Sequence, residues 1–400
     1  MSTDTGIRGK AYLMGAFEHP LRDAPDTSTP QLHAECARGA LIDAGLTKDD
    51  VDGYFCAGDA PGFGGLSMID YMGLKNVRHL DSTETGGSSY IVHVGHAAQA
   101  IAAGKCSVAL ITLAGRPRHG GRRPGAGMAA GGGGLSDGPP EAGFENIYGG
   151  STHNTYGMCA MRHMYEYGTT SEQLAWIKVA ASHHAQWNEH AFLKDVVTVE
   201  DVVNSRMIAD PLHLLDCCVV TDGGGALIVT SPEVAKSLNR PKVRVLGAGE
   251  APKGPRGGLG LDLTHSGAVW SGPRAFEEAG VKPADIKYAS IYDSFTITVL
   301  MQIEDLGFCK KGEGGRFVAD GNLISGVGKL PFNTDGGGLC NNHPTNRGGI
   351  TKVIEAVRQL RGEAHPKVQV ANCDLAIAHG TGGSLGTRHA AATLIMEREG

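Results

Sequence analysis

The chain has 400 residues, of which 41% are hydrophobic and 20% are charged, and its formal net charge at pH 7 is −6. A chain of this length can bury a large core in more than one domain. The acidic balance and the lack of a long basic run argue against a nucleic-acid partner. The first eight residues are polar, and no stretch approaches the roughly 18 consecutive apolar residues of a membrane helix, so we expect a cytoplasmic protein.

Cysteine and histidine spacing gives no sign of a metal site. The nine cysteines are an odd number and form no C-x-x-C pair, a usage typical of a reducing compartment. His183 and His190 share a predicted helix over 171–191, but no acidic residue or cysteine joins them in a ligand pattern. We therefore predict no metal in this chain.

A helix-to-strand unit occurs twice. A strand is expected over 10–16, and helical spacing over 31–44 leads to Gly45, a charged connector and a strand over 54–56. The same order of helix, glycine stop, connector and strand returns around Gly280.

A second pair of segments repeats this order more loosely. A helix over 94–103 stops at Gly104 before a strand over 108–113. A helix over 352–361 stops at Gly362 before a strand over 368–371. Two such echoes predict two similar α/β halves with parallel strands, and the alternative is independent use of a common turn.

An irregular region separates the halves. Residues 116–140 are rich in Gly, Arg and Pro and are expected to form a mobile loop. The predicted helix over 171–191 follows, and a strand over 227–230 closes the first half.

The stretch from Pro331 to Pro344 carries the strongest chemical signal. It begins with Asn333, runs through three consecutive glycines and places His343 directly before a proline. Glycines let a backbone approach a ligand, the proline holds the preceding residue out of a helix, and histidine exchanges protons near neutral pH. The alternative is a glycine-rich surface turn. Tyr292 and His379 are possible partners from neighbouring stretches.

Several motifs in order resemble those of the thiolase superfamily, in particular the sterol-carrier-type thiolases and their thiolase-like acyl-CoA aldolase relatives. They are Leu-Leu-Asp-Cys-Cys at 214–218, Asp-Gly-Gly at 222–224, Tyr-Asp-Ser-Phe-Thr at 292–296, 306–313, Asn-Thr-Asp-Gly-Gly at 333–337 and Arg-Gln-Leu-Arg-Gly at 358–362.

The resemblance covers nearly the whole chain and implies a fold. That fold has two duplicated βαβαβαββ halves in a five-layer α-β-α-β-α sandwich and usually forms a dimer. The halves would be residues 1–240, with an insertion over about 116–216, and residues 241–400. In the family the insertion covers the active site and helps to hold coenzyme A.

A thiolase places its nucleophilic cysteine at a helix start in the first half, where the helix dipole stabilises a thiolate. By the resemblance that position is Gly87, and residues 83–90 contain no cysteine. Ser88 and Ser89 offer hydroxyls, but only Glu84 is near in sequence as a base, so capping is the other interpretation. The missing cysteine would leave room for substrate or water.

The resemblance also implies site residues, and here the sequence is mixed. Gly87 and Tyr292 match the aldolases, whereas His343 and His379 match the thiolases. Tyr292 and His343 are the expected acid and base, although a tyrosine here could also be a buried structural phenol. His379 and Asn333 are expected to stabilise the enolate or orient the other groups. The expected substrate-binding residues are Gly87, Ser88, Glu84, Gly382 and Gly383.

The implied function is carbon–carbon bond cleavage or formation beside an acyl-CoA thioester, with retro-aldol cleavage of a β-hydroxyacyl-CoA first and no acyl-cysteine. The alternatives are a Claisen-type thiolase and a non-catalytic acyl-CoA-binding subunit. Coenzyme A would enter as part of the substrate, and no covalently bound cofactor is expected. The expected partners are a second copy of the chain and a small zinc-ribbon/OB-fold subunit.

Overall fold

A computed structural model describes residues 6–119, 151–253, 262–344, 348–386 and 388–399. Most of the loop predicted over 116–140 lies outside these ranges. The helices are α1 (Thr29–Ala44), α2 (Gly65–Met72), α3 (Ser89–Ala102), α4 (Thr152–Tyr167), α5 (Ser171–Ala185), α6 (Val199–Val203), α7 (Pro232–Ser237), α8 (Ala268–Ala279), α9 (Thr296–Asp305), α10 (Gly314–Val318), α11 (Gly337–Cys340) and α12 (Gly349–Arg361). None of them, within these ranges, has the length and apolar character needed to cross a membrane.

In the described part of the chain, nine strands form one mixed sheet in the order β3-β2-β4-β7-β1-β8-β11-β10-β9. The strands are β1 (Tyr12–Glu18), β2 (Gly53–Phe55), β3 (His79–Asp81), β4 (Val108–Gly115), β7 (Gly223–Thr230), β8 (Val243–Lys253), β9 (Tyr288–Ile291), β10 (Leu375–Gly383) and β11 (His389–Arg398). The remaining described pair, β5 (Met207–Ala209) and β6 (Leu212–His213), forms a small separate hairpin.

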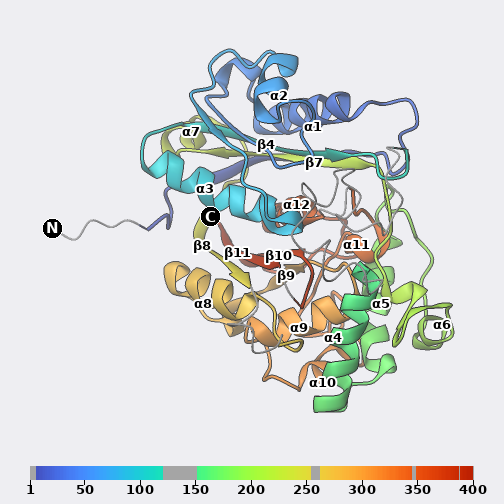
Figure 1. The fold of residues 1–400 in the computed structure, drawn as a ribbon. Coiled ribbons are helices and arrows are strands. Elements are labelled where there is room, and N and C mark those ends of the chain that lie inside the picture. The colour runs from blue at the N-terminus through green and yellow to red at the C-terminus, as the bar shows by residue number, and fades with distance from the viewer. Residues whose placement is uncertain (1–5, 120–150, 254–261, 345–347, 387, 400) are drawn as a thin grey trace.

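The sheet folds over so that its two parts lie in separate layers (Figure 1). Helices α1, α2 and α7 cover the outer face of the first part, and α8 and α9 cover the outer face of the second. Helices α3 and α12 lie between the two parts and share one apolar core with both. The result is the expected five-layer α-β-α-β-α sandwich.

The structure confirms that Gly45 and Gly280 end equivalent helices. Gly45 has φ 75° and Gly280 has φ 66°, and each donates its N–H to carbonyls of the last helical turn. A short 3-10 turn then leads into β2 in the first half and into β9 in the second. β2 pairs in parallel with β4, and β9 pairs in parallel with β10, so the two turns occupy the same topological place.

The second, looser repeat is confirmed for its two helices, but the strand predicted in its second copy is wrong. Gly104 and Gly362 both lie at left-handed φ just past α3 and α12. Residues 368–371 form turns, and the strand begins only at Leu375. The helix predicted over 171–191 ends at Ala185, so His190 lies beyond it. The division into halves near residue 240 stays a prediction.

Candidate active site

Tyr292 and His343 form a buried hydrogen-bonded pair. Tyr292 directly follows β9, and His343 lies just after α11, so the pair joins two stretches that are separate in sequence. The tyrosine hydroxyl lies 2.9 Å from His343 Nε2, and the rings meet edge to face with centroids 5.4 Å apart. The two residues are only 4% and 2% exposed. We call this pair the dyad.

Strand alternation aims Tyr292 at the middle layer. Ile291 packs in the core on the α9 side, and successive strand residues point to opposite faces. The N–H of Tyr292 donates to the carbonyl of His379 at 2.9 Å, which extends the pairing of β9 with β10 by one residue. The phenol is thereby directed towards α3 and Gly87.

Burial sets the protonation states of the dyad. It raises the pKa of Tyr292 well above its usual range, and the nearby Cys218 and Tyr156 act in the same direction. Burial lowers the pKa of His343 to about 4. At neutral pH the phenol is protonated and the imidazole is neutral, so the tyrosine can donate to Nε2. Within the described part of the chain, Nδ1 of His343 has no hydrogen-bond partner.

The phenol of Tyr292 occupies the place beside Gly87. A Cβ atom built on Gly87 would lie 2.5 Å from the hydroxyl and from Cζ of Tyr292, and 2.4 Å from the carbonyl oxygen of Thr381. Real carbon contacts are about 3.5–4.0 Å. The expectation of space for substrate or water at this point is therefore wrong, because the tyrosine fills it. For the same reason, no cysteine fits at position 87 while Tyr292 stays in place.

The neighbouring polar residues brace the turn before α3, although Ser88, which directly precedes this helix, makes no side-chain N-cap hydrogen bond. Ser88 Oγ donates to the carbonyl of Thr85 at 2.9 Å, and Ser89 Oγ accepts the N–H of Thr85 at 2.8 Å. Glu84 accepts the backbone N–H groups of Gly86 at 2.6 Å and of Gly58 at 2.7 Å. Both hydroxyls are engaged with the backbone of Thr85, which is a structural role, but neither acts as a helix cap in the sense predicted.

None of the nine cysteines is prepared to act as a thiolate. Burial raises the pKa of every one of them, and desolvation is the largest cause in each case. A reactive cysteine needs the opposite shift, since the thiolate is the nucleophile. The chain therefore lacks the electrostatic preparation for an acyl-cysteine.

Asn333 is engaged with the backbone of β9. Its Oδ1 accepts the N–H of Ile291 and its Nδ2 donates to the carbonyl of Ile291, both at 2.8 Å. The side chain thus closes a two-bond bridge to the residue that precedes Tyr292. Both ends of the amide are therefore occupied by the residue before Tyr292, which fits the predicted orienting role better than the predicted enolate contact.

The ring of His379 lies on the opposite face of β10 from the dyad. A Cβ on Gly380 would meet Ile91 and Ser88 on the α3 side, so His379, one residue earlier, faces the α8 side. There its Nδ1 lies 2.8 Å from Thr393 Oγ1, which in turn lies 2.9 Å from Ser271 Oγ of α8. The expected convergence of all three side chains is not observed.

Gly382 and Gly383 belong to the wall beside Gly87. A Cβ on Gly382 would lie 1.7 Å from the carbonyl of Thr85, and one on Gly86 would lie 2.9 Å from Cα of Gly382 and from the N of Gly383. The two backbones touch directly, which only glycine permits. Their role in substrate binding stays a prediction.

Two residues near the dyad were not predicted to belong to the site, although one of them, Cys218, lies in the motif over 214–218. Tyr156 of α4 stacks on Phe295 with ring centroids 4.4 Å apart, and Cys218 donates its N–H to the carbonyl of Ser294 at 2.9 Å. Both are close enough to Tyr292 to affect its pKa. No local pattern marks Tyr156, because its contact with the 292–296 stretch is made only by folding.

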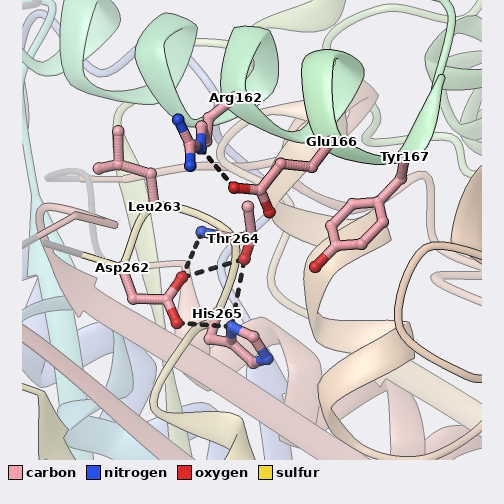
Figure 2. Close-up of a pocket in the computed structure, with 7 residues that line it drawn as sticks. All are labelled: Arg162, Glu166, Tyr167, Asp262, Leu263, Thr264 and His265. Carbon is pink, nitrogen blue, oxygen red and sulfur yellow. Dashed lines mark hydrogen bonds and ion pairs between the residues drawn. The ribbon is translucent and has the colours of Figure 1, made fainter.

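A separate cleft of about 420 Å³ lies at the far end of α4 (Figure 2). Its lining is Arg162, Glu166, Tyr167, Asp262, Leu263, Thr264 and His265. Arg162 is paired with Glu166 at 2.5 Å, and His265 with Asp262 at 2.8 Å. The charges are thus satisfied within the cleft, which contains neither residue of the dyad.

Residues 260–398 match the family described as Thiolase C-terminal domain-like. A steroid side-chain-cleaving aldolase of Thermomonospora curvata is 36% identical over 89% of this chain and 91% of its own. A 17-hydroxy-3-oxo-4-pregnene-20-carboxyl-CoA lyase of Mycobacterium tuberculosis is 34% identical over 89% and 92%. The chain belongs to the thiolase superfamily.

Other superfamily members match over different extents. The benzoylsuccinyl-CoA thiolase subunit BbsB of Thauera aromatica is 39% identical, over 62% of this chain and 66% of its own. A solved structure described as an Ltp2-ChsH2(DUF35) aldolase covers 98% of both chains with a TM-score of 0.84 and 32% identity. Human mitochondrial 3-ketoacyl-CoA thiolase has a TM-score of 0.71 at 14% identity, covering 98% of this chain and 100% of its own, and so shares the fold.

Proposed function

We propose that this superfamily member is an acyl-CoA lyase that cleaves a β-hydroxyacyl-CoA by a retro-aldol reaction without an acyl-cysteine. The observation that carries the proposal is the Tyr292 hydroxyl, which is bonded to His343 and fills the place beside Gly87. A thioester-forming cysteine and this tyrosine exclude each other at that point. The relatives named as a steroid side-chain-cleaving aldolase and a CoA lyase support the same chemistry.

The reaction needs one proton removed and one returned. A base takes the proton of the β-hydroxyl, its oxygen forms a carbonyl, and the bond between Cα and Cβ breaks. The electrons of that bond form the thioester enolate, which is then protonated at Cα. The products are a ketone or aldehyde and a shortened acyl-CoA, and atoms balance without an oxidant or free CoA.

The dyad supplies both functions. The neutral imidazole of His343 accepts the proton through Tyr292, whose hydroxyl passes its own proton to Nε2 as it takes that of the substrate. The protonated His343 then returns the proton by the same route. Because Tyr292 gains one proton as it gives up another, no buried phenolate forms. The pair carries one positive charge, on His343, while the substrate carries the negative charge of the enolate. Loss of such an acid/base group costs about 100- to 10,000-fold in rate.

The remaining site residues act on the dyad or on the enolate. The turn at Gly87, which precedes α3, and those N–H groups of residues 380–383 that do not pair with β11 are the proposed donors to the thioester oxygen. Asn333 orients Tyr292 through the end of β9. His379 acts through its carbonyl oxygen, which holds the N–H of Tyr292, and not through its ring.

Product analysis with and without free CoA tests the proposal. The enzyme is incubated with steroid, aromatic and aliphatic β-hydroxyacyl-CoA and β-ketoacyl-CoA thioesters. We expect carbonyl product from a β-hydroxyacyl-CoA, equal in amount to the shortened acyl-CoA and independent of added CoA. Tyr292→Phe, which removes one hydroxyl and little volume, should lower kcat about 100- to 10,000-fold and leave acyl-CoA binding near normal.

A Claisen-type thiolase is the second candidate, favoured by the 39% identity to the thiolase subunit BbsB. It would cleave a β-ketoacyl-CoA only when free CoA is present. Binding without turnover in any combination would instead indicate a non-catalytic acyl-CoA-binding subunit.

We also propose a homodimer with a further small subunit. Edge strand β3 carries Leu80, and a Cβ on Gly65 at the start of α2 would meet that side chain. Phe63, Leu66 and Tyr71, in or just before α2, are 88%, 65% and 57% exposed, and we propose that a second copy covers them. BbsB is named as a subunit, and the aldolase structure names two components. A small zinc-ribbon/OB-fold subunit would be the second partner. A protein that is monomeric by light scattering and fully active on its own would contradict both the homodimer and the second subunit.

A further inference from the structure

A buried ion pair lies next to the dyad. Lys352 of α12 contacts Asp293 with Nζ 2.7 Å from Oδ1, and the residues are 1% and 0% exposed. Burying two charges carries a desolvation cost that often equals their attraction, so stability alone does not explain such a pair. Neither residue was among those expected to serve the site.

Asp293 connects the segment that carries Tyr292 to the segment that carries His343. It directly follows Tyr292 in sequence, and its two carboxylate oxygens accept the N–H groups of Gly338 at 2.9 Å and Leu339 at 3.2 Å. Those amides belong to α11, the short helix that leads to His343. One carboxylate therefore fixes the distance between the backbones that carry the dyad.

Glycines make this approach possible and also confine the imidazole. A Cβ on Gly337 would lie 2.1 Å from Asp293 Oδ2. A Cβ on Gly338 would lie 3.0 Å from both Asp293 Oδ1 and His343 Cδ2, and one on Gly348 would lie 3.0 Å from the same Cδ2. The ring is thus packed between two backbone segments, and Asp293 holds one of them.

The two charges act on the imidazole with opposite sign. After burial, which is the largest effect, the Asp293 carboxylate raises the pKa of His343 and the Lys352 ammonium lowers it. Tyr292, directly after β9, faces the ring, and Asp335 lies close enough to Lys352 to interact with its charge. Removing one charge of the pair therefore leaves the effect of the other on the pKa of His343 unopposed by its partner.

We propose that Asp293 and Lys352 are positioning residues that hold His343 against Tyr292 and place a balanced pair of charges behind them. The catalytic meaning of this inference rests on the proposed function. The placement of the imidazole and its titration do not depend on the proposed function, and both can be measured without a substrate.

Nuclear magnetic resonance of protein labelled with 15N in its 17 histidines reads the titration of one imidazole. The signal of His343 is assigned by its loss in His343→Gln. Lys352→Met should move the titration of His343 upward by about one pH unit, and Asp293→Asn should move it downward. The double variant Asp293→Asn/Lys352→Met should return it close to wild type. A titration that is the same in all these proteins would overturn the inference.

Turnover supplies the second measurement. Each single substitution should lower kcat about 10- to 100-fold at unchanged KM, as is typical for groups that orient a catalytic side chain. Lys311→Met is the matched control, because Lys311 pairs with Glu304 and Asp305 at 3.0 and 2.6 Å at the end of α9. It should leave kcat unchanged. A loss of kcat in both lysine variants, matched to loss of folded protein, would show a structural pair only.

The double variant keeps the inference testable if either single variant fails to fold. It leaves no unpaired buried charge, but the amide nitrogen of an asparagine cannot accept the N–H of Leu339, so α11 is held by one acceptor. We expect a folded protein with kcat about tenfold lower, and an unchanged kcat would contradict positioning. If the wild type cleaves no β-hydroxyacyl-CoA, the proposed function fails, and the titration still decides this inference.

Discussion

Gly87→Ala perturbs the dyad with a single methyl group. The new Cβ would lie 2.5 Å from the hydroxyl and Cζ of Tyr292, whereas carbon contacts are about 3.5–4.0 Å, so the ring must move by about 1 Å. Gly87 is not among the glycines at positive φ, so alanine adds no backbone strain there. The contact with Tyr292, and that with the carbonyl of Thr381, are what the substitution changes.

A displacement of this size is large for the dyad. It stretches a hydrogen bond of 2.9 Å, and a misplacement of about 1 Å at a catalytic group costs about 100-fold in rate. Overpacking of a buried site costs about 1–3 kcal/mol of stability. We therefore expect Gly87→Ala to lower kcat at least about 100-fold, with a modestly lower Tm.

The assay is the initial rate of carbonyl release from a β-hydroxyacyl-CoA that the wild type cleaves, with thermal unfolding of the same samples. Gly95→Ala is the control, because Gly95 lies on α3, the helix that follows Gly87, and its added Cβ would meet only Ala248 Cβ, at 3.1 Å. That variant should keep near-normal kcat. Wild-type kcat and Tm in Gly87→Ala would refute the placement of the Tyr292 ring.

Four further results are expected. Asn333→Ala should lower the free energy of unfolding by about 2–5 kcal/mol, since it leaves a buried N–H and a buried carbonyl unsatisfied; urea unfolding without such a loss would contradict the bridge. Cys106→Ala and Cys340→Ala should retain most of the wild-type rate, because their raised pKa values keep both thiols protonated, and abolished turnover would argue for a covalent route. Activity should be lost as pH falls through about 4, the lowered pKa of His343, and an acidic limb near its ordinary value of 6.5 would contradict the buried neutral imidazole. That lowered pKa makes the unfolded state bind more protons between pH 4 and 6.5, so urea unfolding should also show stability falling as pH falls across this window.

The sequence predicted the parts of the fold that local rules control. Gly45 and Gly280 stop their helices at left-handed φ, so the duplicated units could be recognised from helical spacing and a glycine. The strand predicted over 368–371 failed because a short apolar run after a helix does not reveal its pairing. The ladder with β9 starts only after Leu375, and that depends on long-range contacts.

The site was only partly predictable. Tyr292 and His343 could be selected because both residue types carry protons and their motifs resemble those of a known family. The sequence did not show which face of β10 carries the His379 ring. Its side chain, one residue before Gly380, points to the face opposite that of Gly380. Lys352 and Tyr156 could not be found, because both reach the site only through the packing of α12 and α4.

Intact-protein mass spectrometry during turnover tests the central claim most directly. Wild-type enzyme is quenched while it cleaves a β-hydroxyacyl-CoA, and its mass is compared with that of the untreated protein and of Tyr292→Phe. We predict an unmodified mass for the wild type, with turnover that depends on the Tyr292 hydroxyl. A stoichiometric acyl group on a cysteine, together with loss of turnover when that cysteine is replaced by alanine, would contradict the account.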